Sequence, residues 1–125
     1  MTESVKVHAV AGEKNWHLIK EMAERLKALD PYKVVLFGSY ASGNPTDDSD
    51  IDVVVILDSD EIPQTHAERT ARREPVTKAV RDIRYKIPMD IVIYSKAEID
   101  YFREVGNSFF DEIETTGKVL YEKRD

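Results

Sequence analysis

Two aspartates, Asp50 and Asp52, stand at the head of a strongly apolar stretch, IDVVVIL. Alternate residues of a β-strand share one face, so both carboxylates are expected to project to the same side of a strand. Two neighbouring carboxylates repel each other unless a cation lies between them. The residue types and their spacing therefore predict a divalent metal bound through carboxylate oxygens.

A Gly-Ser pair, Gly38-Ser39, precedes these aspartates and directly follows a short apolar strand predicted at Lys33–Phe37. Small residues in the turn directly after a strand can present backbone N–H groups to phosphate. Residues 43–49, between the pair and the aspartates, are rich in turn formers and are predicted to form a loop. Phosphate at one side and metal at the other is the arrangement that a nucleoside triphosphate requires.

A third carboxylate, Asp90, begins the apolar run DIVIY much as Asp52 begins its own run. If the two strands are neighbours, Asp50, Asp52 and Asp90 meet at one end of the sheet. Three carboxylates beside a phosphate-binding turn fit a two-metal site for in-line displacement at phosphorus. Asp90 would then act as a metal ligand, as a general base for an acceptor hydroxyl, or as both. The alternative is that the aspartates merely cap a loop. That alternative has to explain why three carboxylates stand at the heads of buried strands without a cation.

The same residues resemble the signature of the nucleotidyltransferases of the DNA-polymerase-β superfamily, which is Gly-Ser, a spacer and then Asp-x-Asp. Here Gly38-Ser39 is followed by ten residues, Tyr40 to Ser49, and then by Asp50-Ile51-Asp52. Asp90 stands where the third carboxylate of the family is expected. The short chain and its ending, KVLYEK, look like the minimal nucleotidyltransferases, which are stand-alone catalytic domains of prokaryotes.

This resemblance implies a polymerase-β-like fold and the transfer of a nucleoside monophosphate, usually AMP from ATP with Mg²⁺, to a hydroxyl group. It also implies that Asp50, Asp52 and Asp90 bind the metals and serve catalysis, and that Gly38 and Ser39 hold the phosphates. Minimal members are frequently encoded beside a HEPN-domain protein, an RNase-like toxin, and act as its antitoxin. In studied members the antitoxin adds AMP to a toxin tyrosine, so the implied partner is a HEPN-type toxin.

The chain departs from the family in the basic residues near the phosphate turn. Members commonly carry a basic residue at one or both of the positions that correspond to Tyr40 and Ser42, and this chain has neither. Tyr40 is expected either to contact the nucleotide or to pack in the core. The arginines around residue 72 alternate with glutamates, which favours a solvated helix face. Any basic contact to the triphosphate must come from elsewhere, and the candidates are Arg72, Arg73, Lys78 and Arg81.

Two other functions stay open at the level of sequence. The chain could be a binding module that keeps the fold and neutralises a toxin by surface contact, which the missing basic residues favour. It could also be a small-molecule nucleotidyltransferase, such as one that modifies an aminoglycoside. Enzymes of that type usually carry an extra domain for the acceptor, and 125 residues leave little room for one.

Composition narrows the class of protein. A chain of 125 residues with 42% hydrophobic and 34% charged residues predicts one globular domain over residues 1–125. The absence of cysteine excludes disulfides and Cys-ligated zinc, and no apolar run reaches the length of a membrane span. A net charge of −6 argues against direct nucleic-acid binding. Because no signal peptide is visible, the expected location is the cytoplasm.

Hydrophobic periodicity predicts an α+β fold, a small mixed β-sheet flanked by helices in two layers. Residues 1–12 are predicted as a short edge strand or a frayed end. A helix is predicted at Glu13–Leu29, ended by Asp30-Pro31, and its apolar stripe includes Leu29. Further strands are predicted at Asp50–Leu57, with both faces buried, at Met89–Tyr94, and at the sheet edge over Lys118–Tyr121.

Helix-capping signals locate the remaining helices. Thr65 with Glu68, and Ser95 with Glu98, are each predicted to form a capping box. Pro75 is expected to kink the first of these helices or to restart it. The last helical region is predicted to break near residues 106–107 and to end at Gly117. Its core side is assigned to five apolar residues, which are Ile99, Phe102, Val105, Phe109 and Ile113.

Overall fold

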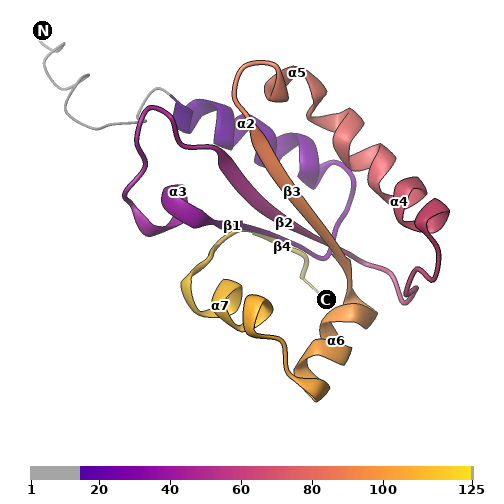
Figure 1. The fold of residues 1–125 in the computed structure, drawn as a ribbon. Helices are drawn as coiled ribbons and strands as arrows, with labels where there is room; N and C mark the ends of the chain where they lie inside the picture. Colours follow the sequence, from indigo (N-terminus) through magenta and orange to yellow (C-terminus); the bar gives the residue numbers. More distant parts are fainter. Residues whose placement is uncertain (1–14, 125) are drawn as a thin grey trace, which may run out of the picture.

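The computed structural model describes residues 15–124, in which four strands form one mixed sheet (Figure 1). The strand order is β3-β2-β1-β4; β1 is antiparallel to both of its neighbours, and β2 is parallel to β3. The predicted strands, including the edge strand at the C-terminal end, are therefore confirmed. Residues 1–12, predicted as an edge strand or a frayed end, lie outside the described residues. The strands are β1 (Lys33–Phe37), β2 (Ile51–Leu57), β3 (Met89–Ser95) and β4 (Lys118–Glu122).

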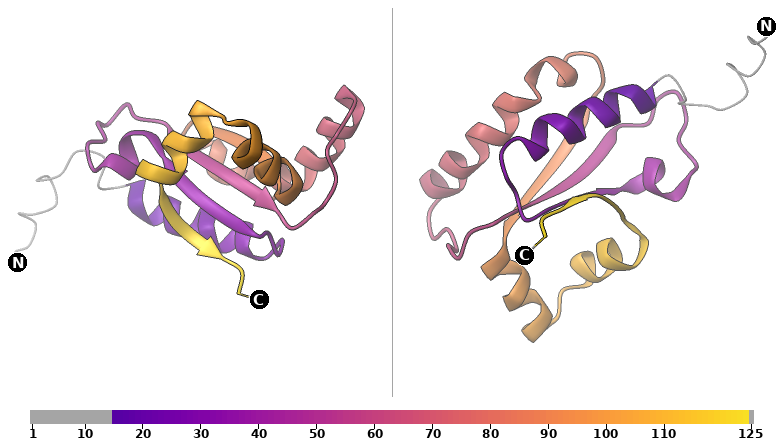
Figure 2. Two further views of the ribbon diagram at one scale, coloured as in Figure 1. Left: turned by 90° about the horizontal axis from the view of Figure 1, so that it is seen from below. Right: turned by 180° about the vertical axis from the view of Figure 1, so that it is seen from behind.

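Helices cover both faces of the sheet, so the prediction of two layers was wrong although the α+β class is confirmed (Figure 2). The reason is visible in β2, whose side chains alternate between two apolar cores. Val53 and Val55 belong to one core, and Val54 and Ile56 belong to the other. The helices are α2 (Trp16–Lys27), α3 (Gly38–Ser42), α4 (His66–Ala79), α5 (Arg81–Arg84), α6 (Lys96–Val105) and α7 (Ser108–Thr116).

The larger core lies between the sheet and α2, α4 and α5, and the smaller core lies under α6 and α7. Val53, Val54 and Val55 are completely buried between them. Burying one such side chain contributes roughly 1.5–3 kcal/mol, which makes the middle of β2 an apolar anchor for both layers. A charged residue is tolerated only at the head of this strand, where Asp52 is half-buried.

α2 ends at Lys27, two residues before the end predicted for this helix. Leu29, assigned to the apolar stripe, is 37% exposed, and Asp30 adopts a positive φ of 57°. The left-handed backbone at Asp30 reverses the chain into β1, so the turn begins before the proline does. The predicted start at Glu13 lies outside the described residues.

α4 continues through Pro75, so no helix restarts there. Val76, directly after the proline, is buried against the sheet and holds this turn in place. The break falls instead at Val80, between α4 and α5, where φ is −116°. The apolar face of this segment continues past the break, because Val80, Ile83 and Ile87 are also buried.

The two capping predictions had different outcomes. Ser95 and Glu98 form the complete box, since the Ser95 Oγ accepts from the Glu98 N–H and the Glu98 carboxylate accepts from the Ser95 N–H. The Thr65 hydroxyl accepts a hydrogen bond from the Glu68 N–H. The Glu68 carboxylate, however, accepts a hydrogen bond from the N–H of Gln64, at 2.6 Å, and not from the N–H of Thr65. The second box is therefore only half formed.

α6 and α7 are separated at Gly106 and Asn107, as predicted. The break changes the helical phase, so the core residue of α7 is Phe110, which is 2% exposed. Val105 and Phe109, assigned to the core from sequence, are exposed. Gly117 does end α7, as predicted, and its lack of a side chain lets β4 begin close to Ile113 and Val35.

None of the helices within residues 15–124 combines the length and the apolar character that crossing a membrane requires.

Candidate active site

The three predicted carboxylates come together at one end of the sheet. β2 and β3 run parallel in a register that sets Asp52 directly beside Asp90. Asp50 lies one residue before β2 begins, two positions from Asp52. In the strands the residues that follow on the same face, Val54 and Val92, pack towards α6 and α7. Asp52 and Asp90 therefore share the face of the sheet that these two helices cover, and Asp50 lies close enough to affect the pKa of Asp52.

Asp52 is the electrostatic centre of this group. Its pKa is raised above the ordinary carboxyl value, mainly by burial and then by the negative charges of Asp90 and Asp50. Asp50 and Asp90 are exposed, so Asp52 alone is partly withdrawn from water. A cation held between these groups would offset both the repulsion and the loss of hydration.

The residues present fit a divalent metal of the hard, oxygen-binding kind. All three groups offer carboxylate oxygens, and the negative charges of Asp90 and Asp50 add to the effect of burial in raising the pKa of Asp52. Among the described residues, no three acidic, histidine or cysteine side chains are already drawn together closely enough to hold a metal ion.

Gly38 is required by the position of Asp52. It has a positive φ of 75°, and a Cβ atom placed there would collide with the Asp52 Oδ2 atom and approach its Cγ at 3.1 Å. The absence of a side chain brings the backbone at the end of β1 against the carboxylate. The predicted turn at Gly38-Ser39 is in fact the start of the five-residue helix α3.

Tyr40 packs in the core and leaves the nucleotide no access to its ring. It is completely buried, its hydroxyl accepts a hydrogen bond from the Asn15 side chain at 2.8 Å, and Trp16 contacts it edge-on. These contacts decide between the two roles expected for this residue. They also fix α3, and with it Gly38 and Ser39, against the start of α2.

Comparisons with known proteins agree with this geometry. Residues 18–119 match the family described as "Nucleotidyltransferase domain". The chain belongs to this nucleotidyltransferase family. Over 85 residues it is 33% identical to a protein of Methanocaldococcus jannaschii named "Putative protein adenylyltransferase", a match that covers 68% of this chain and 74% of that protein.

A solved structure shows the same fold. It is described as a "putative nucleotidyltransferase" from Sulfolobus solfataricus, and it superimposes with a TM-score of 0.57 at 19% sequence identity. The superposition covers 86% of this chain and 79% of that one. The polymerase-β-like nucleotidyltransferase fold is thereby confirmed, and the chain is a nucleotidyltransferase.

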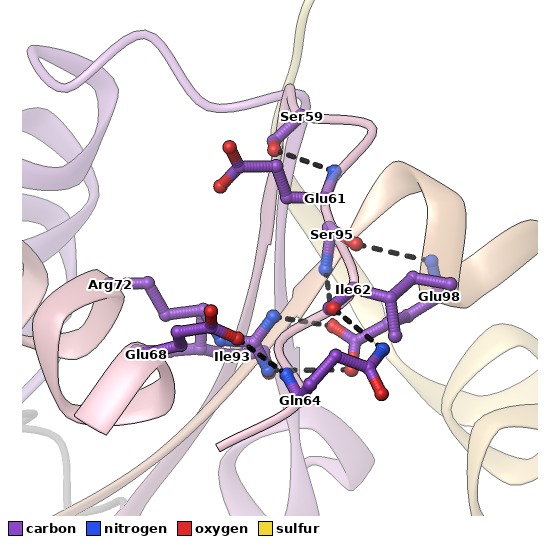
Figure 3. Close-up of polar contacts among 9 residues, drawn as sticks. All are labelled: Ser59, Glu61, Ile62, Gln64, Glu68, Arg72, Ile93, Ser95 and Glu98. Atoms are coloured by element: carbon purple, nitrogen blue, oxygen red, sulfur yellow. Dashed lines mark hydrogen bonds and ion pairs between the residues drawn. The ribbon is translucent and has the colours of Figure 1, made fainter. Parts of the chain in front are cut away.

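Two arginines that were candidates for contact with the triphosphate are engaged elsewhere, and Figure 3 shows the contacts of one of them, Arg72. Arg72 forms an ion pair with Glu98 at 2.5 Å and donates to the Ile93 carbonyl at 2.9 Å. Arg73 donates to the Ile91 carbonyl at 2.9 Å. Both side chains fasten α4 to the outer strand, so they are neither phosphate ligands nor part of a solvated face.

The pocket beside Arg72, several of whose lining residues are drawn in Figure 3, does not include the carboxylates. It has a volume of about 400 Å³ and lies where β2 and β3 end, whereas the carboxylates lie where these strands begin. Its lining includes Glu61, Glu68 and Arg72, whose guanidinium is already paired with Glu98. This pocket therefore lacks the charge pattern that would attract a triphosphate.

The other candidate cations, Lys78 and Arg81, are exposed. Arg81 lines a groove with Arg84, Tyr85, Pro88 and Met89, the residue before Asp90. Sequence reasoning missed Arg84. The available signal was its position just before the strand that carries Asp90.

An aromatic pair borders the carboxylates on the other side. Phe37 is the register partner of Asp52 in β1, and its ring contacts Phe109 of α7 edge-on at 5.6 Å. Phe109 is 41% exposed, so the pair offers apolar surface on the face that the carboxylates share. Sequence analysis assigned Phe109 to the core because its spacing continued the helical stripe of α6.

Proposed function

We propose that this nucleotidyltransferase transfers AMP from ATP, with Mg²⁺, to a tyrosine hydroxyl of a HEPN-type RNase toxin, and so acts as its antitoxin. The observation that carries the proposal is the register of β2 and β3, which sets Asp52 beside Asp90 with Gly38 against the Asp52 carboxylate. The name of the Methanocaldococcus jannaschii relative supports a protein as the acceptor.

Each residue has a defined part in this proposal. Asp50 and Asp52 would hold Mg²⁺, which when bound neutralises the triphosphate and polarises its phosphorus–oxygen bonds. Gly38 and Ser39 would place backbone N–H groups near the phosphates. Asp90 accepts the proton of the acceptor hydroxyl, whose oxygen bonds to the α-phosphorus as pyrophosphate leaves.

The test is transfer of labelled AMP from ATP to the purified product of the neighbouring gene in the presence of Mg²⁺. Label should appear on that protein, and Asp52→Ala should remove it. The exposed Asp60 lies beyond the other end of β2, so Asp60→Ala is the matched control and should retain full transfer. Absence of label from the partner, or label that persists in Asp52→Ala, refutes the proposal.

A second function, neutralisation of the toxin by contact alone, is favoured by one observation. Arg72 and Arg73, two of the four cations proposed to replace the missing basic residues, are bound to β3 and α6. The double variant Asp50→Ala/Asp52→Ala separates the two functions in a growth assay with the partner toxin. Full rescue by the variant favours contact, and loss of rescue favours chemistry.

A further inference from the structure

A group of basic residues surrounds α5 and contrasts with the acidic character of the chain. The net charge of the protein is −6, yet four cations and one exposed tyrosine lie within nine residues. Tyr85 is 85% exposed, the largest exposed fraction among the apolar and aromatic side chains noted as exposed. We call this group the α5 patch, and it consists of Lys78, Arg81, Arg84, Tyr85 and Lys86.

The acidic residue within this segment does not neutralise the patch. Asp82 accepts two hydrogen bonds from the guanidinium of Arg25, at 2.7 and 3.0 Å. This pairing lowers the pKa of Asp82 to about 2, mainly through the hydrogen bond. Asp82 pairs mainly with Arg25 of α2 and interacts more weakly with Lys86, so its negative charge is taken up mainly by a residue outside the α5 patch.

The α5 patch adjoins the carboxylates through a short connection. Arg81, Arg84 and Tyr85 line a groove of about 480 Å³ that also includes Pro88 and Met89. Met89 immediately precedes Asp90, and the Pro88 carbonyl accepts a hydrogen bond from the first residue of β2 at 3.0 Å. On the other side of this connection, Lys86 lines a hollow with residues 47–49, the loop that leads to Asp50.

The groove and the carboxylates lie on different sides of β3. Met89 packs into the larger core, whereas Asp90, one residue on, projects towards the opposite face of the sheet. β3 is the outer strand of the sheet, so no further strand separates the groove from Asp90. A chain bound in the groove can therefore pass around this edge towards Asp90, which directly follows Met89 of the groove lining.

We propose that the α5 patch docks an acidic segment of the acceptor protein and so presents the acceptor hydroxyl at Asp90. This inference rests on the proposed transfer to a protein. Arginine and tyrosine are the side chains that most often dominate the binding energy of protein interfaces. A protein segment fits better than RNA, because the acidic remainder of the chain repels a long phosphate backbone but not a short local charge.

Fluorescence anisotropy with three labelled probes of equal length tests the docking surface. The probes are a glutamate-rich peptide with one tyrosine, a lysine-rich counterpart and a single-stranded oligoadenylate RNA. We expect only the glutamate-rich peptide to bind, and added salt to weaken its binding. Arg81→Glu/Arg84→Glu should reduce its affinity roughly tenfold or more. Tighter binding of the RNA, or no binding of the acidic peptide, overturns the proposal.

The matched control is Arg69→Glu/Arg124→Glu, which changes the charge by the same amount at exposed positions near the opposite end of the sheet. It should bind the peptide as the wild type does, and circular dichroism should show that both double variants are folded. If the control loses as much affinity for the peptide, net charge alone explains the effect, and the assignment of binding to the α5 patch is overturned.

Two further measurements separate this inference from the proposed function. Asp52→Asn should bind the peptide normally but transfer no AMP to the partner toxin. Arg84→Glu, which leaves the candidate triphosphate contact Arg81 in place, should raise the KM for the toxin while the KM for ATP stays unchanged. If wild-type protein binds the peptide but transfers no AMP, the proposed function fails. If transfer proceeds with an unchanged toxin KM in the charge-reversed variant, the docking surface fails.

Discussion

Asp52 has an unfavourable electrostatic environment in the folded protein. Its pKa is raised by burial first, and then by the charges of Asp90 and Asp50. A carboxyl group whose pKa is higher in the folded state than in the unfolded state binds more protons when folded. Ionisation of Asp52 therefore destabilises the fold, and this destabilisation grows as the pH rises through the folded-state pKa.

Asp52→Asn removes that charge with little change in shape. Without divalent cations, the variant should unfold about 1–4 °C above the wild type at neutral pH. The difference should disappear as the pH falls through the ordinary carboxyl range, because protonation then removes the same charge from the wild type. Thermal unfolding across pH measures the effect, with Asp60→Asn as the exposed control. A variant less stable than the wild type at neutral pH contradicts the expected sign.

Gly38 and Gly43 form a natural matched pair, since both have a positive φ, of 75° and 83°. Alanine at either position should lower the free energy of unfolding by about 1–2 kcal/mol through backbone strain. Only Gly38→Ala also drives a Cβ atom into the Asp52 carboxylate, because nothing lies within 4 Å of such an atom at Gly43.

Gly38→Ala should therefore reduce AMP transfer roughly 100-fold, as expected when a reacting group is displaced by about 1 Å. Gly43→Ala should retain transfer despite its similar loss of stability. Equal activities of the two variants would show that contact with Asp52 does not limit the reaction.

At this scale the sequence predicted which carboxylates meet but not what holds them. Strand geometry predicted that Asp50 and Asp52 lie together, although β2 begins at Ile51 and leaves Asp50 just outside it, and Asp90 was placed by its position before a similar apolar run. The need for glycine at position 38 depends on the register of β1 with β2, which pairs Phe37 with Asp52. No local pattern carries that information.

Among the elements, α4 is fastened to the sheet by charged side chains. Arg72 and Glu98 are 19% and 17% exposed, so their ion pair is shielded from water, unlike the pair between Arg103 and Glu114. Arg72→Ala should lower the free energy of unfolding by about 2–3 kcal/mol, because it also leaves the Ile93 carbonyl without its donor.

A double-mutant cycle with Glu98→Gln, which can keep the helix cap, measures the pairwise part of this energy in urea unfolding. The coupling should be about 1–2 kcal/mol for this pair and below about 1 kcal/mol for the exposed pair. Equal couplings would show that burial does not strengthen the Arg72 pair.

The elements that sequence misplaced share one physical cause, which is tertiary packing. Pro75 remains inside α4 because Val76 is anchored in the core, and packing overrides the loss of one backbone donor. Arg72 and Arg73 alternate with glutamates, as solvated residues do, yet their partners are carbonyl groups of a strand that follows more than ten residues later. Such partners can be found only once the strand order is known.

For the whole molecule, stability and ligand binding are coupled. Mg²⁺ with a non-hydrolysable ATP analogue should raise the free energy of unfolding by about 1 kcal/mol at roughly five times the dissociation constant, because the ligand binds only the folded state. Chelation by EDTA should reverse the rise, and Asp52→Asn should abolish it. A rise of equal size in Asp52→Asn would place the ligand away from the carboxylates.

The fold class was predictable because apolar strands alternate with helical periodicity along the chain. The number of layers was not, since the uninterrupted apolar run of β2 shows that both faces are buried but not which helices cover each face. The change of helical phase between α6 and α7 also could not be predicted, because it depends on how the helices pack on the sheet. As a result Phe110 lies in the core and Phe109 does not.

The arginines on β3 have a consequence for self-association. An outer strand with the sequence MDIVIYS offers free carbonyl groups along an apolar segment, which is the kind of edge that recruits further strands into fibrils. Arg72 and Arg73 occupy the carbonyls of Ile93 and Ile91 and place a helix alongside them. The same two side chains that are unavailable to ATP thus shield this edge of β3 from pairing with strands of other molecules.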